Sequence, residues 1–222
     1  MSNPPKLYKI LRSKKSLLKF QRKVKRELLL IKLKKPPIRV CGIDTSYKDE
    51  KAVTCCVIFS DKSQRLEEVT FHVSFKLKDY IPTYFSLREL EPSLKALKKA
   101  KVKPDLIFIN ACGINHPITG LASHIGYLTK IPTIGVTKET LVGKVGEEIR
   151  CNQKVKAFRL LHENLQVGWK IEREGHRPIY VSPGDYITLP ETLNLSLKFL
   201  NNSFPFPLSN AHTLSKHYLK LI

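Results

Sequence analysis

The sequence lacks an apolar run long enough to span a bilayer. Its charged N-terminal stretch contains no continuous hydrophobic segment of the kind found in secretory signals. It has no internal repeat and no Gly/Ser-rich linker. The five cysteines form an odd set without CxxC spacing, which argues against a disulfide framework and against a zinc site. From these absences we expect a single domain in a reducing, cytoplasmic compartment, with no membrane partner.

Acidic residues are also scarce, because 19 Asp and Glu face 39 Lys and Arg among the 222 residues and leave a formal charge of +20. Such an excess favours a polyanionic partner, most often nucleic acid. A basic surface that serves only solubility is the plain alternative, and anionic lipid is a weaker one. The excess is concentrated in residues 1–36, where 13 Lys and Arg accompany one acidic residue, Glu27.

The apolar pattern predicts an α/β protein. Residues 7–33 have helical spacing between many Lys and Arg, and Pro36-Pro37 would end this basic N-terminal helix. Three strands separated by polar turns then predict an antiparallel meander, and strand, helix and strand with short links predict a parallel βαβ unit. We therefore expect a mixed sheet flanked by helices. The predicted strands span 39–47, 52–60, 67–76, 105–110, 132–136 and 179–182, with a hairpin within 158–173, and the later helices span 86–101, 120–129, 191–200 and 211–221.

Several polar residues at the ends of these elements could carry chemistry. Asp44 lies in the first strand, where it could hold a divalent ion, although a strand-end Asp satisfied by a turn would look the same. Glu89 lies in a first helical turn, where a Glu usually only complements the helix dipole. Lys138 follows a strand and suits a phosphate. His212 falls at the predicted start of the last helix, where capping and surface histidines are common.

The stretch DLIFINACGINHPI delivers an amide rather than an acid to the end of a strand. Asn110 ends a nearly continuous apolar run, as expected for a strand covered on both faces. Gly113 and Gly120 then precede a helix, where glycines let backbone N–H groups approach an anion or a base edge. His116 and His124 could equally be structural, His124 above all.

Taken in order, these stretches resemble the endonuclease V family, which cuts nucleic acid near deoxyinosine or inosine on a ribonuclease H-like fold. The resemblance runs from about residue 38 to the C-terminus and rests on GIDTSY, DYIP, FSLRE, DLIFINACGINHP, GLASHIGYLTKIPTIGVTK, PIYVSPG and the late AH. It implies a ribonuclease H-like mixed sheet and a nuclease domain over residues 37–222, which forms a single domain with the basic helix of residues 1–36. It also implies Mg²⁺ as cofactor, with Mn²⁺ as a substitute, and DNA or RNA containing deaminated adenine as partner.

The resemblance further implies roles for single positions. Asp44 matches the metal ligand of the first strand, and Asn110 stands where a second ligand is expected. Glu89 matches the helix carboxylate that works through metal-bound water, Lys138 the lysine near the scissile phosphate, and His212 the histidine beside the attacking water. The nucleic-acid contacts fall in a wedge that fills the space of the flipped base and in the loop that lines the base pocket. These positions are Tyr80, Ile81, Pro82, Thr83, Ala111, Gly113, Ile114, His116 and Gly120.

The sequence departs from the family pattern where function is most sensitive. The departures are Asn110 for an Asp, Ala111-Cys112 for Gly-His, Thr83 for a Gly, a link shortened to Ile118-Thr119, Asp185 for a His, and Ser209-Asn210 for Arg-Leu. Magnesium prefers anionic oxygen, which an amide does not supply. A barrier raised by ~3–5 kcal/mol would slow the reaction roughly 10²–10⁴-fold. Asp185 would restore the lost charge only if its loop folds toward Asn110.

We therefore predict a metal-dependent endonuclease, slowed or altered by Asn110, that hydrolyses a phosphodiester 3′ to the lesion and leaves a 5′-phosphate and a 3′-hydroxyl. The alternative is a catalytically silent paralogue that binds nucleic acid without cutting it. The retained polar residues Asp44, Glu89, Lys138 and His212 favour the nuclease, and the changes at the cleft favour the binder. A peripheral membrane protein is a distant third hypothesis that rests on the basic helix alone.

Overall fold

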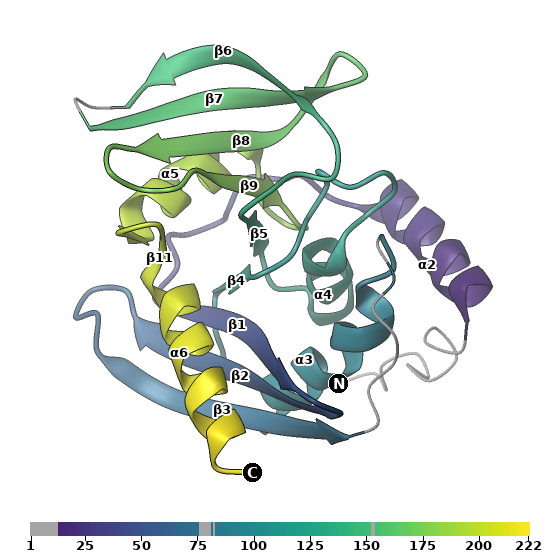
Figure 1. Ribbon diagram of the computed structural model, residues 1–222. Helices are drawn as coiled ribbons and strands as arrows, with labels where there is room; N and C mark the ends of the chain where they lie inside the picture. Colours follow the sequence, from purple (N-terminus) through teal and green to yellow (C-terminus); the bar gives the residue numbers. More distant parts are fainter. Residues whose placement is uncertain (1–12, 76–80, 82, 152–153) are drawn as a thin grey trace.

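A large mixed sheet organises the molecule. The computed structural model describes residues 13–75, 81, 83–151 and 154–222 (Figure 1). Within these residues nine strands form one sheet in the order β3-β2-β1-β4-β5-β9-β8-β7-β6. The strands are β1 Arg39–Lys48, β2 Lys51–Ser60, β3 Leu66–Phe75, β4 Leu106–Ile109, β5 Thr133–Thr137, β6 Lys144–Arg150, β7 Val155–His162, β8 Leu165–Arg173 and β9 Ile179–Pro183.

The pairing of the strands confirms the predicted mixed sheet. β1, β2 and β3 form an antiparallel meander, and β4 and β5 continue from β1 in parallel. β9 then pairs with β5 in antiparallel fashion. The predicted hairpin is confirmed as β7 and β8. The sequence analysis did not predict β6, whose alternation is weak and whose register with β7 shifts between Val145 and Glu148.

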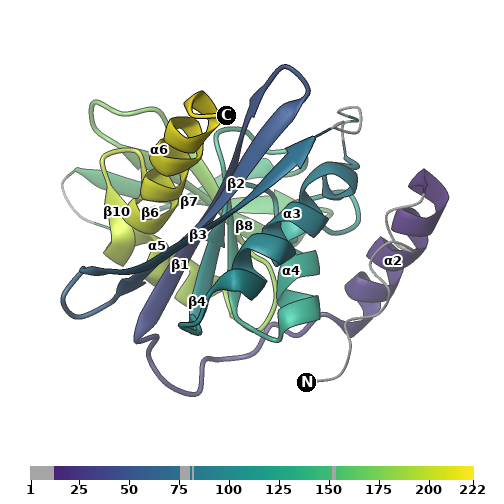
Figure 2. The same cartoon turned by 90° about the horizontal axis from the view of Figure 1, so that it is seen from below.

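Helices cover both faces of this sheet (Figures 1 and 2). The helices are α2 Lys14–Glu27, α3 Ser86–Lys99, α4 Leu121–Thr129, α5 Leu189–Phe199 and α6 Phe206–Lys220, and a short ribbon joins β10 Leu200–Asn201 to β11 Phe204–Pro205. α2, α3 and α4 pack on one face and α5 and α6 on the other, which gives the core two halves. β4 supplies both halves, because Ile107 points to the first and Phe108 to the second. Its continuous apolar sequence follows from this double burial.

The N-terminal helix is shorter than predicted. α2 begins after a capping box of Ser13 and Ser16 and ends at Glu27; the predicted residues 7–12 lie outside the described part. The extension to residue 33 was wrong, because Leu28 is extended and the following backbone binds loops of the domain. Leu29 N–H donates to Asp185 Oδ1 at 2.8 Å, and Leu33 N–H donates to Glu191 Oε1 at 2.9 Å. These tertiary hydrogen bonds compete with the helix and win.

α2 packs as an integral part of the domain. It buries Leu17, Phe20, Gln21 and Val24, and the three apolar residues belong to the first half of the core. Its Lys and Arg side chains lie on the opposite, exposed face. None of the helices within the described residues is long and apolar enough to cross a membrane.

Candidate active site

Two neighbouring strands bring Asp44 and Asn110 together. β1 and β4 run in parallel with Ile43 opposite Ile109. The residues that follow these two, Asp44 and Asn110, therefore lie side by side. Asn110 Nδ2 donates a hydrogen bond of 2.7 Å to Asp44 Oδ1. Asp44 is buried, whereas Asn110 is exposed. The Asn110 amide therefore contacts both the buried carboxylate and solvent. It lies beside Asp44, in the position that the sequence predicted for the second metal ligand.

Helix α6 supplies the other partner of Asp44. His212 Nδ1 lies 2.7 Å from Asp44 Oδ2, and Ser215 Oγ lies 3.5 Å from the same oxygen. The His212 side chain remains 46% exposed, so a ring held at Nδ1 presents Nε2 toward solvent. The predicted place of His212 at the start of the last helix was wrong, because Pro205 precedes a helix that begins at Phe206. His212 lies in the second turn, and this register directs it to β1.

Glu89 reaches the same end of the sheet from the opposite face. It lies in the first turn of α3, is buried, and accepts a hydrogen bond from the hydroxyl of Tyr47. The guanidinium of Arg88 lies over the Tyr47 ring at 3.9 Å from its centroid. Burial raises the pKa of Glu89 to about 8, the negative charge of Asp44 adds to the rise, and Tyr47 and Arg88 oppose it. Glu89 can therefore gain or lose a proton close to neutral pH.

The sequence analysis missed Tyr47 and Ser215, although both follow from strand and helix periodicity. Ser46 is on the α6 face of β1 with Asp44 and meets Ser215 at 2.7 Å. Tyr47 is on the other face and reaches Glu89. Alternation along GIDTSY therefore sends Asp44 and Tyr47 to different helices. The spacing of these residues indicates which face of the strand or helix they occupy. Their contact partners could be identified only from the positions of α3 and α6.

The donor set at Asp44 is compatible with one hard divalent ion, but it carries little charge. Within the described residues no group of three His, Cys, Asp or Glu side chains is arranged to hold a metal. Both carboxylate oxygens of Asp44 receive N–H groups, from Asn110 and His212. Turning the Asn110 amide about its Cβ–Cγ bond would bring Oδ1 to Asp44 in place of Nδ2. Asp44 and Asn110 could then share a Mg²⁺ or Mn²⁺ ion with one negative charge.

The loop after Asn110 is held to β9 by hydrogen bonds. Gly113 N–H donates to Ser182 Oγ at 2.9 Å, and Ile114 N–H donates to the Pro183 carbonyl at 2.9 Å. A Cβ at Gly113 would lie 2.1 Å from the Pro183 carbonyl oxygen, and one at Gly120 would lie 2.1 Å from that of Cys112. Packing therefore requires both glycines. Their expected use in exposing N–H groups does not hold, because both glycines are buried and the Gly120 N–H donates to the Gly113 carbonyl at 2.8 Å. Ala111 is likewise buried.

His116 joins this loop to the segment that follows the predicted wedge. Its Nδ1 accepts from Ile118 N–H at 3.1 Å, and its Nε2 donates to the Thr83 carbonyl at 2.9 Å. Burial lowers the pKa of His116, which suits a neutral ring protonated at Nε2. Thr83 has φ of +65°, a left-handed conformation that favours glycine. Ile81 is half-buried, whereas Tyr80 and Pro82 of the wedge lie outside the described residues.

The structure does not join the other two predicted positions to the Asp44 group. Lys138 is exposed just beyond the end of β5. Asp185 is buried, and its Oδ1 accepts from the backbone of Leu29 and Tyr186. The Asp185 carboxylate is thus used to hold residues 28–33, so it does not replace the charge that is missing at Asn110.

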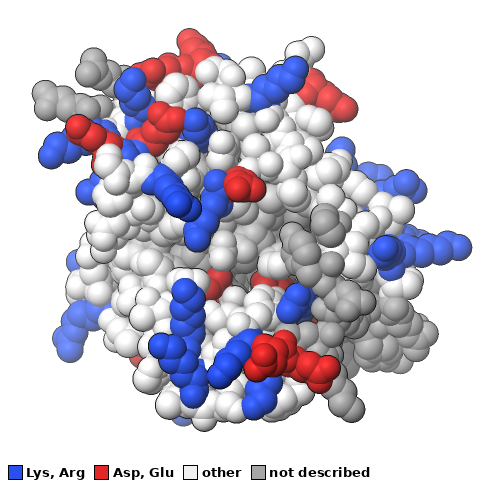
Figure 3. Space-filling model, viewed as in Figure 1, with Lys and Arg blue, Asp and Glu red and all other residues white. Residues whose placement is uncertain are grey.

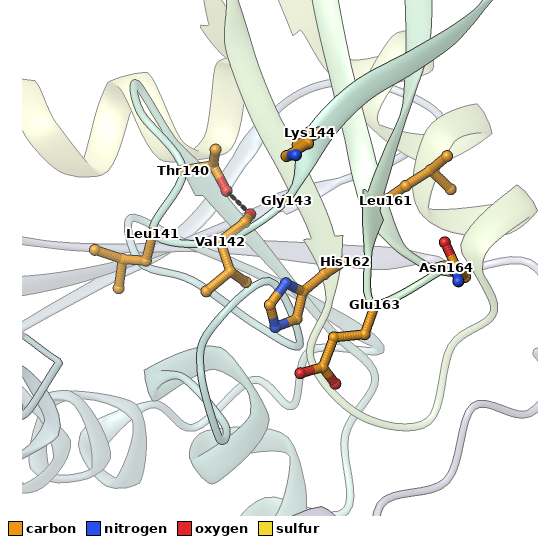
Figure 4. A pocket seen from close by; sticks show the side chains of 9 residues that line it. All are labelled: Thr140, Leu141, Val142, Gly143, Lys144, Leu161, His162, Glu163 and Asn164. Atoms are coloured by element: carbon orange, nitrogen blue, oxygen red, sulfur yellow. Dashed lines mark hydrogen bonds between the residues drawn. The ribbon is translucent and has the colours of Figure 1, made fainter.

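The surface near these groups is predominantly basic. In Figure 3, Lys and Arg side chains lie above and below a hollow in this face, and a few acidic atoms are visible within it. A separate open pocket of about 640 Å³ lies between the loop after β5 and the β7–β8 turn (Figure 4). Its lining from Thr140 to Lys144 and from Leu161 to Asn164 includes none of the predicted catalytic side chains. We therefore place the candidate active site at Asp44, Glu89 and His212, and not in this pocket.

Comparison with known proteins agrees with this geometry. The family model for endonuclease V matches residues 19–213. The endonuclease V of Thermosipho melanesiensis is 33% identical over 202 residues, which cover 90% of this chain and 88% of the relative. That of Archaeoglobus fulgidus is 32% identical over 187 residues, covering 80% and 79%.

Solved structures show the same fold. The endonuclease V crystal structure from Streptomyces avermitilis superposes with a TM-score of 0.84 and 26% identity, covering 94% of this chain and 93% of that one. The Ciona intestinalis enzyme, solved with a 24mer DNA containing an inosine followed by a ribo-adenosine, gives a TM-score of 0.79 at 21% identity and covers 93% and 97%. The predicted ribonuclease H-like fold is confirmed. The chain belongs to the endonuclease V family and is thereby a nuclease, a phosphodiester hydrolase.

Proposed function

We propose that this protein is a divalent-metal-dependent endonuclease acting on deoxyinosine in DNA or inosine in RNA. It cuts a phosphodiester on the 3′ side of the modified nucleotide and leaves a 5′-phosphate and a 3′-hydroxyl. The observation that carries the proposal is the meeting of Asp44, Asn110 and His212, with Glu89 arriving from the opposite face. The relative from Ciona intestinalis, solved with inosine-containing DNA, supports the substrate class.

The residues suggest how the chain handles protons. His212 donates Nδ1–H to Asp44, so the neutral ring can accept a proton at Nε2 from an attacking water. Attack on phosphorus breaks the bond to the 3′ oxygen, and this oxygen takes up a proton, for which Glu89 is the proposed donor. Glu89, with a pKa of about 8, can carry a proton near neutral pH. Asp44 and Asn110 would hold the Mg²⁺ or Mn²⁺ ion, which would stabilise charge on the phosphate oxygens.

The basic surface and the two loops would position the strand. Lys138, exposed beyond β5, suits a phosphate near the cut. Removal of a base from the stack costs a few kcal/mol, which an aromatic and apolar wedge can partly offset. We assign the wedge to Tyr80, Ile81 and Pro82, a nucleic-acid contact to Thr83 directly after it, and the base pocket to Ala111, Gly113, Ile114, His116 and Gly120.

Asn110 sets the rate in this account. Its amide donates a hydrogen bond to Asp44, and compared with a carboxylate it removes one negative charge from the ion site. A silent paralogue that binds without cutting is the second candidate, and the same hydrogen bond favours it, because Asn110 Nδ2 occupies the Asp44 oxygen that an ion would need.

Cleavage of a labelled strand with one inosine, as DNA and as RNA, separates these candidates. The assay is run with Mg²⁺ and with Mn²⁺, beside Asp44→Ala and beside the same strand with adenosine. A working nuclease cuts the inosine strands, and Asp44→Ala abolishes the cut. Binding without any cut in either metal would contradict the nuclease and support the binder.

A further inference from the structure

The N-terminal helix contacts the predicted recognition loops through one buried polar side chain. Gln21 is 2% exposed, on the inner face of α2. Its Nε2 donates to the Thr119 carbonyl at 3.1 Å and to the Thr83 carbonyl at 3.4 Å. In return, the Thr119 hydroxyl donates to the Gln21 carbonyl at 3.2 Å. The amide is therefore bonded to two loops that are far apart in the sequence.

The two carbonyls border the proposed base-recognition elements. Thr83 directly follows the wedge and has a left-handed backbone. Its carbonyl also receives His116 Nε2–H at 2.9 Å. Thr119 closes the loop that carries His116 and precedes Gly120. Gln21 thus donates to the wedge side and to the pocket side at once, and it shares the Thr83 acceptor with His116.

The same hydrogen bonds continue to the helix that carries Glu89. Thr119 Oγ1 lies 3.1 Å from His124 Nε2, and Ser86 Oγ lies 2.6 Å from His124 Nδ1. These three side chains are at most 2% exposed. Because Thr119 donates to Gln21, it must accept from His124 Nε2–H, and His124 Nδ1 must then accept from Ser86. Ser86 opens α3, so a network of hydrogen bonds runs from α2 to the start of the helix that carries Glu89.

The outer face of α2 is suited to phosphate. Lys15, Lys19, Arg22 and Arg26 are exposed on the helix whose inner face holds Gln21. Figure 3 shows basic side chains on the side where Figure 1 places α2. A strand bound there would rest on the helix that also holds the recognition loops.

We propose that Gln21 is a positioning residue for inosine recognition, because it fixes the carbonyls of Thr83 and Thr119 and thereby the spacing between the wedge and the base pocket. This inference rests on the proposed function. Gln21 touches neither substrate nor ion. Gln21 affects the discrimination between inosine and other bases. The basic surface provides the general affinity for nucleic acid.

The test measures base discrimination and needs no cleavage. Affinities for a single-inosine strand and for its adenosine counterpart are compared by fluorescence anisotropy in EDTA, for the full chain and for Gln21→Met. Methionine keeps the length and removes the N–H donors. We expect the inosine affinity to fall about tenfold, as for a lost positioning bond, and the adenosine affinity to stay unchanged.

Two control variants separate positioning from simple loosening of the fold. Val24→Ala removes two buried methyl groups from the same face of α2 and keeps the Gln21 donors. It should lower thermal stability without changing the ratio of the two affinities. Gln166→Met removes an amide that donates to the Gly168 carbonyl in β8, at the other end of the sheet. It should also leave the ratio unchanged.

Each result decides a different claim. The positioning role is supported if the ratio of inosine-strand affinity to adenosine-strand affinity falls in Gln21→Met and in neither control variant. If the full chain discriminates inosine, and Gln21→Met keeps the ratio or Val24→Ala lowers it equally, the positioning role is wrong and the proposed function stands. If the full chain binds both strands equally, the positioning role is wrong, and the cleavage assay on the inosine and adenosine strands decides the proposed function separately.

Discussion

Asp44 and His124 are both buried polar side chains with a partner on each side, yet their surroundings differ. The two closest partners of Asp44 are the exposed Asn110 and the half-exposed His212, and the buried Ser215 lies farther away at 3.5 Å. The partners of His124 are Ser86 and Thr119, which are themselves buried. Burial of a polar group thus marks a candidate site only where its hydrogen-bond partners reach solvent. The first group should control rate, and the second should control stability.

The largest expected effect comes from removing the exposed partner of Asp44. His212→Ala should lower the single-turnover cleavage rate by roughly 10²–10⁴-fold, because the proton acceptor for water is lost. Its half-exposed ring contributes little packing, so the melting temperature should change little. His217→Ala, an exposed histidine of the same helix, is the control. A cleavage rate that survives His212→Ala would contradict the role of this site.

A large effect on stability should come from the other group. Burial lowers the pKa of His124 to about 3, whereas an unfolded histidine titrates near 6.5. The unfolded chain therefore takes up the proton first as the pH falls. The free energy of unfolding should drop by up to about 1.4 kcal/mol per pH unit from 6.5 downward.

Denaturant unfolding between pH 4.5 and 7.5 would measure this slope. His124→Gln keeps hydrogen-bonding groups without a titrating ring, so its slope should be flatter than that of the native chain. His116, whose pKa burial also lowers, should leave a smaller residual slope in this variant. Equal slopes in the two proteins would show that His124 is not the acid-sensitive group.

The smallest expected effect concerns the outer face of α2. Lys19→Gln with Arg22→Gln should weaken strand binding and reduce the slope of log affinity against log salt by roughly 2, because two fewer counterions are released. Both side chains are exposed, so the fold should be unaffected. Lys62→Gln with Lys103→Gln, exposed at the opposite end of β1 and β4, should leave the slope unchanged. Equal slopes in both double variants would place the strand away from α2.

Sequence patterns anticipated the strands of the sheet other than β6, together with α3, α4 and the mixed topology, because these elements alternate, repeat or form a continuous apolar run. It failed where tertiary hydrogen bonds decided the backbone. The helix predicted to residue 33 ends at Glu27, since Asp185 and Glu191 bind the next segment. α6 begins at Phe206 rather than at residue 211, because Pro205 and the β10–β11 ribbon set its start.

The sequence identified residues of the candidate site, but it did not predict which residues they contact. Asp44, Glu89 and His212 were named from short motifs, and the structure gathers them around the second half of β1. Gln21 could not be found in this way, because its partners Thr83 and Thr119 lie far along the chain. Asp185 was open in the sequence, and only its bonds to Leu29 and Tyr186 show that it serves the fold.

The most direct test of the account is the cleavage rate of Asn110→Asp with Mg²⁺ on a single-inosine strand. The new carboxylate restores the charge missing beside Asp44, so the rate should rise at least about tenfold. Without metal the two carboxylates repel, so the melting temperature in EDTA should fall and Mg²⁺ should restore it. A rate equal to that of the native chain, with the metal-dependent recovery intact, would contradict the claim that Asn110 limits this nuclease.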